Sequence, residues 1–243
     1  MEKRVAILQS NYIPWRGYFD IVGLVDEFVI FDVVQFTKND WRNRNRIKTA
    51  AGVQWLTIPV ATAGKFGQTI AQTRIARSNW TVKHWRAIEQ SYSKAPYFEM
   101  YRDRLAAAYR ACGALEYLSA VNRTLIEVLA SELGLSTRIS SAEDYRMDGG
   151  RSERLVALCR TLGARVYVSG PSGRNYLDRG LFAESGIVVE FVDYSNYVPY
   201  PQLHGSFEPA VSVLDLLFNT GQTAASYMHC GHHTVTRQPS NRH

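Results

Sequence analysis

The sequence predicts an α/β protein with a Rossmann-like parallel sheet and a mainly helical insert. Short apolar segments, typical of buried parallel strands, recur along the chain. Most are separated by segments whose apolar residues have helical spacing, which is the order expected of a parallel sheet. Between residues 80 and 135 the helical pattern is almost continuous. We therefore expect a single α/β domain over residues 1–221, with a helical insert at about 80–135.

The first part of the sheet is predicted from the N-terminal sixty residues. Val5–Gln9 has the pattern of a short buried strand, and Pro14 precedes the helical spacing of Tyr18–Val25. Glu27–Phe36 is a second strand candidate, and Val53–Pro59 is a third, which its proline ends. Strand, turn, helix and strand in this order open a parallel α/β sheet.

The later elements follow from apolar spacing and stop signals. Tyr101–Arg110 and Tyr117–Leu133 show helical spacing within the insert, and Gly134 is a helix stop signal. The remaining predicted elements are the strand Thr137–Ser141, the helix Ser152–Leu162, the strands Arg165–Ser169 and Ile187–Val192, and the helix Ala210–Asn219. The polar residues 222–243 predict a loosely ordered C-terminal tail.

Composition excludes several classes of protein. Hydrophobic residues make up 46% of the chain, which predicts a packed core rather than disorder. No apolar segment reaches the ~20 residues of a membrane span, and no signal-peptide pattern precedes the first strand, so we expect a cytoplasmic protein. Cys112, Cys159 and Cys230 are too far apart to predict a disulfide framework. The formal charge of +6 permits a phosphate-containing or nucleic-acid partner without requiring one.

The turn after the first strand is the first candidate site, because it combines amides with aromatic side chains. In parallel sheets, ligands bind at the carboxyl ends of strands and next to helix N-termini. Gly17 would let a ligand approach the backbone closely. The expected ligand-binding residues are Gln9, Asn11, Tyr12, Trp15 and Tyr18. The alternative is a packed aromatic corner, with Trp15 and Tyr18 in the core.

Cations alternate along the segment Trp41–Lys48. In an extended strand, Arg42, Arg44, Arg46 and Lys48 would share one face, which suits a phosphate-rich ligand. The alternative is a solvated edge strand whose charges prevent aggregation. The expected substrate-binding residues of this segment are Asn43, Arg44, Asn45 and Lys48.

A Gly- and Ser-rich turn follows the predicted strand Arg165–Ser169. Such a turn can bind phosphate through its backbone N–H groups. It matches neither the P-loop nor the dinucleotide fingerprint, and the alternative is an ordinary connection. The expected ligand-binding residues are Ser169, Gly170, Ser172, Gly173 and Tyr176.

Two acids are candidate catalytic groups. Asp32 interrupts an apolar strand, where a carboxylate is costly unless it is paired or functional. Asp215 shares a predicted helical face with Ser212 and Asn219, and helix capping is the alternative for Ser212 and Asp215. A further catalytic candidate is His204, and further substrate-binding candidates are Gln35 and Gln202.

The tail contains a cluster of metal-ligand residue types. His229, Cys230, His232 and His233 are too compressed for one tetrahedral site, so we expect no native metal. No Ser-His-Asp, HExxH or CxxC pattern appears, and we expect no cofactor.

Six motifs of the chain together resemble the WbqC-like protein family. The resemblance runs from about residue 5 to residue 221, and the motifs are specific jointly rather than singly. They are Gln9–Phe19, Asp32–Phe36, Trp41–Ile47, Trp55–Val60, Ser169–Leu177 and Ser212–Gly221. Ser10 replaces the usual proline of the family pattern, and the segment beyond Gly221 is additional.

The resemblance implies a biosynthetic transferase, because genes of this family often lie beside genes for bacterial surface polysaccharides or natural products. It implies amide-forming transfer of an acyl or aminoacyl group, such as glycyl, from a phosphate-containing or tRNA-borne donor to a small amine acceptor. Two alternatives stay open. One is a nucleotide-sugar-dependent glycosyltransferase, although neither a carboxylate-bound metal site nor a second Rossmann half is visible. The other is a non-enzymatic module that binds RNA or sugar phosphates.

A weaker resemblance concerns the fold alone. A strand, a ligand turn, a helix and a strand ending in Gln-Phe are similar to the nucleotidyltransferase and HUP-like type of Rossmann domain. The His-x-Gly-His signature of those enzymes is absent, and Pro14–Gly17 stands in its place. The resemblance therefore does not extend to adenylation by the usual route.

Overall fold

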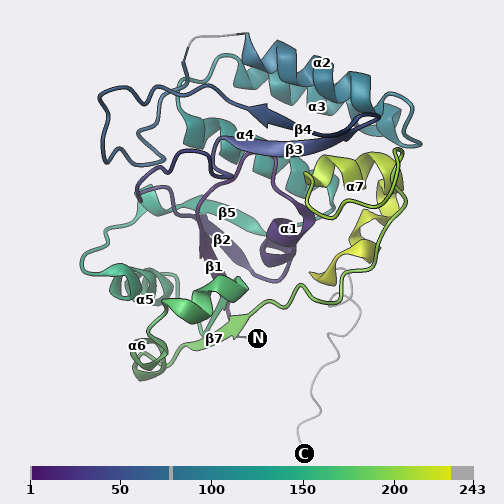
Figure 1. Cartoon of the computed structure of the whole chain (residues 1–243). Helices are drawn as coiled ribbons and strands as arrows, with labels where there is room; N and C mark the ends of the chain where they lie inside the picture. Colours follow the sequence, from purple (N-terminus) through teal and green to yellow (C-terminus); the bar gives the residue numbers. More distant parts are fainter. Residues whose placement is uncertain (1, 77–78, 231–243) are drawn as a thin grey trace, which may run out of the picture.

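The protein is built on a five-stranded parallel sheet (Figure 1). The computed structural model describes residues 2–76 and 79–230. The strands are β1 (Arg4–Leu8), β2 (Glu27–Ile30), β5 (Arg138–Ser141), β6 (Val166–Ser169) and β7 (Val188–Phe191). Their order is β5-β2-β1-β6-β7, and every neighbouring pair is parallel. This Rossmann-like order confirms the predicted α/β class and places a topological switch between β1 and β6.

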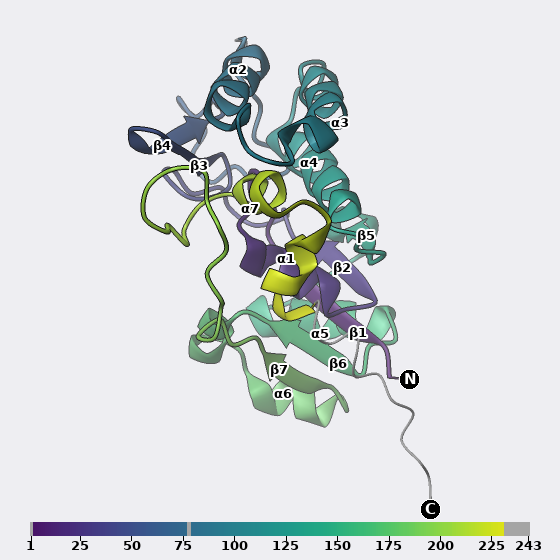
Figure 2. The same cartoon turned by 90° about the vertical axis from the view of Figure 1, so that its right-hand side faces the viewer.

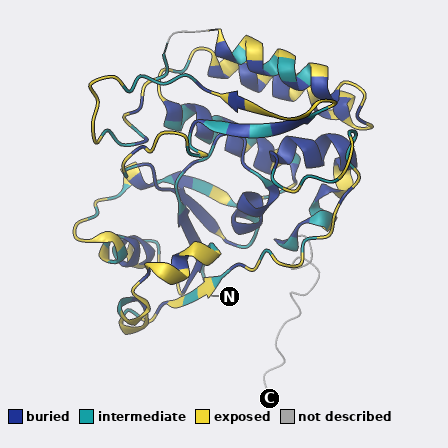
Figure 3. Cartoon of the chain, viewed as in Figure 1, coloured by how far each residue is buried: buried dark blue, intermediate teal, exposed yellow. Residues whose placement is uncertain are grey.

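Alternate residues of the central strand β1 face two separate cores. Ala6 belongs to one core, whereas Val5 and Ile7 belong to the other. Helices that pack on the first core are α1 (Arg16–Gly23), α2 (Trp80–Tyr92), α3 (Phe98–Cys112), α4 (Leu118–Glu132) and α7 (Val213–Thr220). Helices that pack on the second are α5 (Arg151–Thr161) and α6 (Arg179–Glu184). Figure 2 shows the two groups on opposite sides of the sheet, and Figure 3 shows exposed residues on the outward faces of α2 and α6.

A β-hairpin lies between the sheet and α2. It consists of β3 (Arg44–Thr49) and β4 (Gly52–Thr57), which pair antiparallel, and β3 contacts both α2 and α7. Ile47 and Leu56 face the core and are buried, while Arg44 and Arg46 lie on the opposite face of β3. The alternation predicted for this segment is therefore present within β3.

Asn45 fixes the hairpin to the turn after β1. Its buried side-chain amide donates to the backbone carbonyls of Tyr12 and Ile13 at 3.0 and 2.9 Å, and its oxygen accepts from the Arg46 N–H at 2.8 Å. Ile13 has a φ of 36°, which is a strained conformation for a β-branched residue. Such strain persists only where surrounding contacts enforce it, and the Asn45 amide supplies two of those contacts.

The second strand is shorter than the sequence predicts. The apolar segment Glu27–Phe36 suggests ten extended residues, but β2 ends at Ile30. The following residues leave the sheet and pair with the loop at residues 68–71, where Phe36 N donates to Gln68 O and Ile70 N donates to Val34 O. The backbone groups of residues 32–36 therefore find their partners in a loop rather than in a neighbouring strand, and a local sequence pattern does not reveal this.

The C-terminal part packs against the core further than the sequence suggests. Ser212 is the N-cap of α7, and its Oγ accepts from Leu214 N at 3.3 Å, so capping accounts for this serine. A 3-10 helix, η3 (Gly221–Tyr227), follows α7, and both Ala224 and Met228 are buried. Loose order was expected from residue 222, whereas this segment is packed; residues 231–243 lie outside the described part of the chain.

The two described segments contain no helix with the combination of length and hydrophobicity that crossing a bilayer requires.

Removing the Asn45 amide should destabilise the protein. Asn45→Ala leaves two buried carbonyls without their donor, and we expect a loss of about 2–3 kcal/mol in the free energy of unfolding. Chemical denaturation monitored by tryptophan fluorescence measures it. The control is Asn175→Ala at an exposed position, for which we expect a change within about 0.5 kcal/mol. Equal losses in the two variants would show that Asn45 does not hold the hairpin.

Candidate functional site

The carboxylate of Asp32 organises the carboxyl ends of β1 and β2. It is 1% exposed and lies just beyond the end of β2. One of its oxygens accepts from Ser10 N at 2.8 Å, and the other accepts from Ser10 Oγ at 2.6 Å and from Ser119 Oγ at 2.5 Å. The carboxylate is thus paired, as its cost in an apolar strand requires, and its partners are hydroxyls and a backbone N–H.

Helix α4 contributes two residues that sequence reasoning missed. Ser119 reaches Asp32, and the Asn122 amide donates to Ser10 Oγ at 2.9 Å and to the Arg42 carbonyl at 2.8 Å. These polar residues lie in a helix whose other buried positions are apolar, such as Leu118. That interruption of an apolar face was the available signal, because a buried amide needs partners.

Arg42 joins two of the predicted ligand-binding amides. Its guanidinium donates to the side-chain oxygens of Gln9 and Asn11 and lies 3.7 Å from an Asp40 carboxylate oxygen. Because a guanidinium has only donors, both amides present their oxygens to it. Their NH₂ groups point away from Arg42 and form no hydrogen bond to any residue the structure describes. The turn after β1 thus offers several N–H donors at the carboxyl end of this central strand.

Burial dominates the electrostatics of this site. It raises the pKa of Asp32, although the hydrogen bonds from Ser10 and Ser119 and the charge of Arg42 act to lower it. Burial also raises the pKa of Tyr18, and the negative charge of Asp32 adds to the effect. The Tyr18 hydroxyl donates to the Gln9 carbonyl at 3.2 Å, which ties α1 to the same turn.

A second buried acid, Asp215, lies on α7. Tyr92 Oη donates to one of its oxygens at 2.9 Å, and Gln202 Nε2 donates to the other at 2.7 Å. Burial raises the pKa of Asp215. Lys48 Nζ donates to Gln202 Oε1 at 2.6 Å and to the carbonyl of Ser206. Lys48 and Gln202 therefore belong to this network rather than to the Arg42 cluster.

The aromatic residues of the first turn are mostly packed. Tyr12 is fully buried, and its hydroxyl lies 2.8 Å from both His84 Nδ1 and Tyr109 Oη. Burial lowers the pKa of His84 to about 4. Trp15 packs against Tyr194, with 5.0 Å between ring centroids. These contacts anchor the turn to α2, α3 and the segment after β7.

Gly17 accommodates the protein's own side chain. A Cβ at this position would lie 2.4 Å from the Trp15 ring, so the indole fills the space expected for a ligand. Gly173 is similar, since a Cβ there would lie 2.4 Å from Ser169 Oγ. Both glycines are explained by close packing within the protein.

The Ser- and Gly-rich turn lies on the other side of β1 from Asp32. It forms a 3-10 helix, η2 (Pro171–Asn175), in which Ser172 is exposed and Gly173 is buried. Gly170 is partly exposed, whereas Tyr176 is 47% exposed. No hydrogen bond in the described part of the chain joins this turn to Arg42, so its place in a shared site remains a prediction.

Four further candidates have individual positions. Asn43 donates to the Ile58 carbonyl at 2.9 Å, and Asn45 anchors the hairpin as described, so both amides serve the backbone. Gln35 is exposed beside Thr69, with which it forms a β-bridge. His204 Nε2 lies 2.9 Å from the Ser91 carbonyl.

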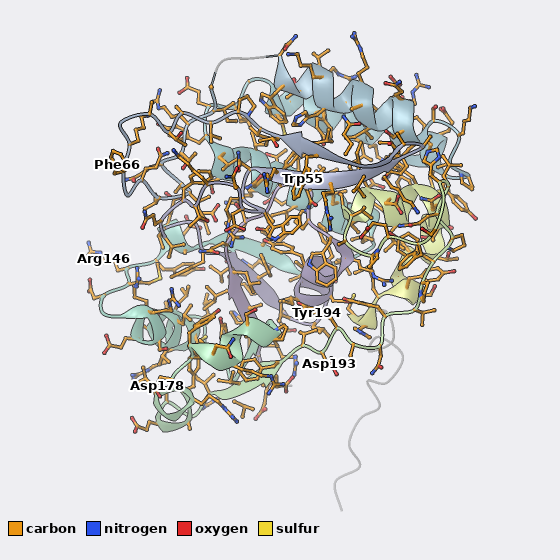
Figure 4. The ribbon with its side chains drawn as sticks, viewed as in Figure 1. Trp55, Phe66, Arg146, Asp178, Asp193 and Tyr194 are labelled. Atoms are coloured by element: carbon orange, nitrogen blue, oxygen red, sulfur yellow. The ribbon has the colours of Figure 1, made fainter. Side chains whose placement is uncertain are left out.

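The outer face of the hairpin carries aromatic rings and cations. Trp41 and Trp55 are 41% and 42% exposed, and the Arg44 guanidinium lies 4.1 Å from the centroid of the Trp55 ring. Figure 4 shows Trp55 on the hairpin and Tyr194 lower in the same view. The sequence motif Trp41–Lys48 therefore supplies Arg42 to the site at the strand ends and Arg44 to the neighbouring surface.

Of the residue types in the tail that could ligate a metal, the structure describes His229 and Cys230. His229 stacks on Tyr197 with 4.5 Å between ring centroids, and Cys230 is buried, with its N–H donating to Asp20 at 2.8 Å. His232 and His233 lie outside the described residues. Within residues 2–76 and 79–230, no group of three His, Cys, Asp or Glu side chains is arranged to hold a metal ion.

Comparison with known proteins assigns the family. A family model described as the WbqC-like protein family matches residues 9–227, which is most of the chain. The chain belongs to the WbqC-like family. The uncharacterized protein Rv1507c of Mycobacterium tuberculosis is 51% identical over 230 residues, covering 93% of this chain and 97% of that protein. No solved structure matches the chain significantly.

Ser10 of this WbqC-like protein has a structural role in the turn after β1. Ser10 supplies Asp32 with both a backbone N–H and a hydroxyl donor. A proline at this position would supply neither. The buried carboxylate therefore receives two donors from one residue of the turn.

Asp32 should make the protein lose stability as the pH rises. Because its folded-state pKa is raised above the unfolded value of about 3.9, the folded state binds more protons between the two values. The stability of the wild type minus that of Asp32→Asn should fall across this window, by up to about 1.4 kcal/mol per pH unit. Urea unfolding of both proteins from pH 4 upward measures the difference. The raised pKa of Asp215 affects the stability of both proteins equally, so it cancels.

The matched control is Asp103→Asn, which removes an exposed carboxylate from α3. A difference between the wild type and Asp32→Asn that rises with pH would mean that the donors outweigh burial, contrary to this account.

Proposed function

We propose that this WbqC-like protein is an amide-forming transferase, which moves an acyl or aminoacyl group from a phosphate-containing or tRNA-borne donor to a small amine. The observation that supports the proposal most is the arrangement of Arg42 between Gln9 and Asn11 at the carboxyl end of β1. The strand ends of a parallel sheet are the usual place for a ligand, and this group of donors is available there.

The hydrogen-bond donors of this site suit the chemistry of acyl transfer. Attack on a carbonyl carbon places negative charge on the carbonyl oxygen, and preorganised N–H donors stabilise that charge. The Gln9 and Asn11 amides have their NH₂ groups directed away from Arg42, while Arg42 adds a positive charge. In the proposed site these groups face the acyl oxygen.

The reaction balances without an added energy source when the donor is an activated ester. The amine nitrogen attacks the acyl carbon, a C–N bond forms, and the C–O bond to the donor breaks. The leaving oxygen takes up the proton that the amine loses. An aminoacyl ester of tRNA meets this requirement, and an acyl phosphate or acyl adenylate meets it as well.

Asp32 and Asp215 have positioning roles in this proposal. Sequence reasoning offered both as acids that act on the amine, but each is 1% exposed and is bonded by donors of the chain itself. We assign to Asp32 the placement of Ser10 and hence of the amides beside it. Asp215 holds Gln202, which in turn holds Lys48.

In the proposed complex, the acyl donor lies on the side of the site that faces the hairpin. Arg44 provides a cation for its phosphates, and the turn at Ser169–Gly173 is a second candidate for phosphate binding. We also propose that the fold is of the nucleotidyltransferase or HUP-like type. Family membership and the Rossmann-like sheet are compatible with this assignment.

The test is turnover with defined donors. The purified protein is incubated with aminoacyl-tRNA, acyl adenylates or nucleotide-sugars and a panel of amino sugars and other amines, and products are detected by mass. We expect amide products, and we expect Arg42→Ala to lower kcat about 10²–10³-fold by removing an oxyanion donor. Arg42→Lys keeps the charge but cannot bridge two amides, so it should also be impaired.

The control is Arg160→Ala, which removes an exposed cation from α5 and should retain full turnover. Glycosyl products, binding without any turnover, or amide synthesis that is equal in the wild type and Arg42→Ala would each overturn the proposal.

A further inference from the structure

Two large indoles are exposed side by side, one on β4 of the hairpin and one just before β3. Trp41 and Trp55 are 41% and 42% exposed, and their rings lie 5.5 Å apart at an interplanar angle of 32°. A solvated strand that only needs charge to prevent aggregation does not require exposed indoles. Exposed aromatic rings that lie together are typical of a surface that binds a ligand or a partner molecule.

Cations accompany the two rings. Arg44 lies 4.1 Å from the Trp55 centroid, and Arg46 lies 5.6 Å from Trp55 and 5.9 Å from Trp41. Arg46 approaches Glu208 at 4.0 Å, whereas the Arg44 side chain forms no ion pair or hydrogen bond with any described residue, although its charge helps to lower the pKa of Asp40. Its Nε is buried, so the donors that it can offer to an anionic ligand are those of its two terminal NH₂ groups, from which no described residue accepts.

The register of the hairpin produces this arrangement. Arg46 pairs directly with Trp55 and Arg44 with Thr57, so the side chains of these residues share the face opposite to buried Ile47. Trp41 precedes β3 and is fixed by the hydrogen bond from Tyr12 N to its carbonyl at 3.0 Å. The strand thus holds the rings and cations together before any ligand arrives.

We propose that the face formed by Trp41, Arg44, Arg46 and Trp55 binds a single-stranded segment of RNA. Bases stack on the indoles, and the guanidinium groups contact the phosphates, which is the combination that single-strand binding uses. This deepens the proposed function, on which it rests, by assigning the RNA class of donor and its contact surface. Arg42 follows Trp41 directly in the chain, so an RNA end on this face would reach the Gln9–Arg42 site.

The experiment measures binding without turnover. A fluorescein-labelled single-stranded oligoribonucleotide and its duplex are titrated with the protein at several salt concentrations, and anisotropy is recorded. We expect the single strand to bind more tightly than the duplex. Trp41→Ala and Trp55→Ala should each weaken binding about tenfold. Arg44→Gln should reduce the slope of log K against log salt by about 0.7.

Two controls separate this surface from general charge and general stacking. Arg160→Ala removes a cation elsewhere, and Tyr117→Ala removes an exposed ring that lies beside Arg74 at 5.1 Å. Both should bind RNA like the wild type. Arg44→Gln keeps both indoles, so it remains informative if a tryptophan variant fails to fold.

Equal RNA affinity in the wild type and the folded hairpin variants would overturn the inference, as would preference for the duplex or capture of an acidic peptide in place of RNA. If amide synthesis from acyl adenylates persists while RNA does not bind, only this inference fails. If RNA binds here as expected but no donor is ever turned over, the proposed transferase activity fails and the surface stands.

Discussion

The arrangement of the site depends on the burial of one carboxylate. Asp32 lies out of solvent at the end of β2, where an ionised group is costly unless donors reach it. Those donors come from Ser10 on the turn after β1 and Ser119 on α4, so satisfying Asp32 brings a strand end, a turn and a helix together. Asn122 extends the network to the Arg42 backbone. The positions of the neighbouring amides follow from this requirement.

A second set of contacts holds the hairpin in register with that turn. Asn45 donates to two carbonyls of the turn, and Tyr12 N donates to the Trp41 carbonyl. The strained φ of Ile13 lies between these contacts. Under the proposed function, preorganisation of this kind would lower the reorganisation that acyl transfer requires, because the donors would already point where charge develops. The proposed acyl site and the proposed RNA surface are therefore parts of one rigid connection between β1 and β3.

The sequence predicts those features that depend on local periodicity. Apolar strands alternating with helices indicated the parallel sheet, and the alternation of Arg44 and Arg46 with their neighbours indicated one cationic face. The partners of Asp32 could not be predicted, since Ser119 is 87 residues away and no local pattern shows which helix face meets a strand end. The strand predicted over Glu27–Phe36 is too long for the same reason, because a local pattern does not show that a distant loop pairs with its second half. The glycine at position 17 was expected to admit a ligand, but spacing alone did not show that Trp15 fills the space.

Native-state hydrogen exchange of the Ser10 backbone amide tests the central claim most directly. This N–H donates to Asp32 Oδ1, so in the wild type it should exchange only on global unfolding, with the protection of the β1 core amides. In Asp32→Ala it should exchange far faster than the amides of β6, because the turn loses its acceptor while the sheet remains. If Ser10 is equally protected in both proteins, or unprotected in the wild type, then Asp32 does not organise the site.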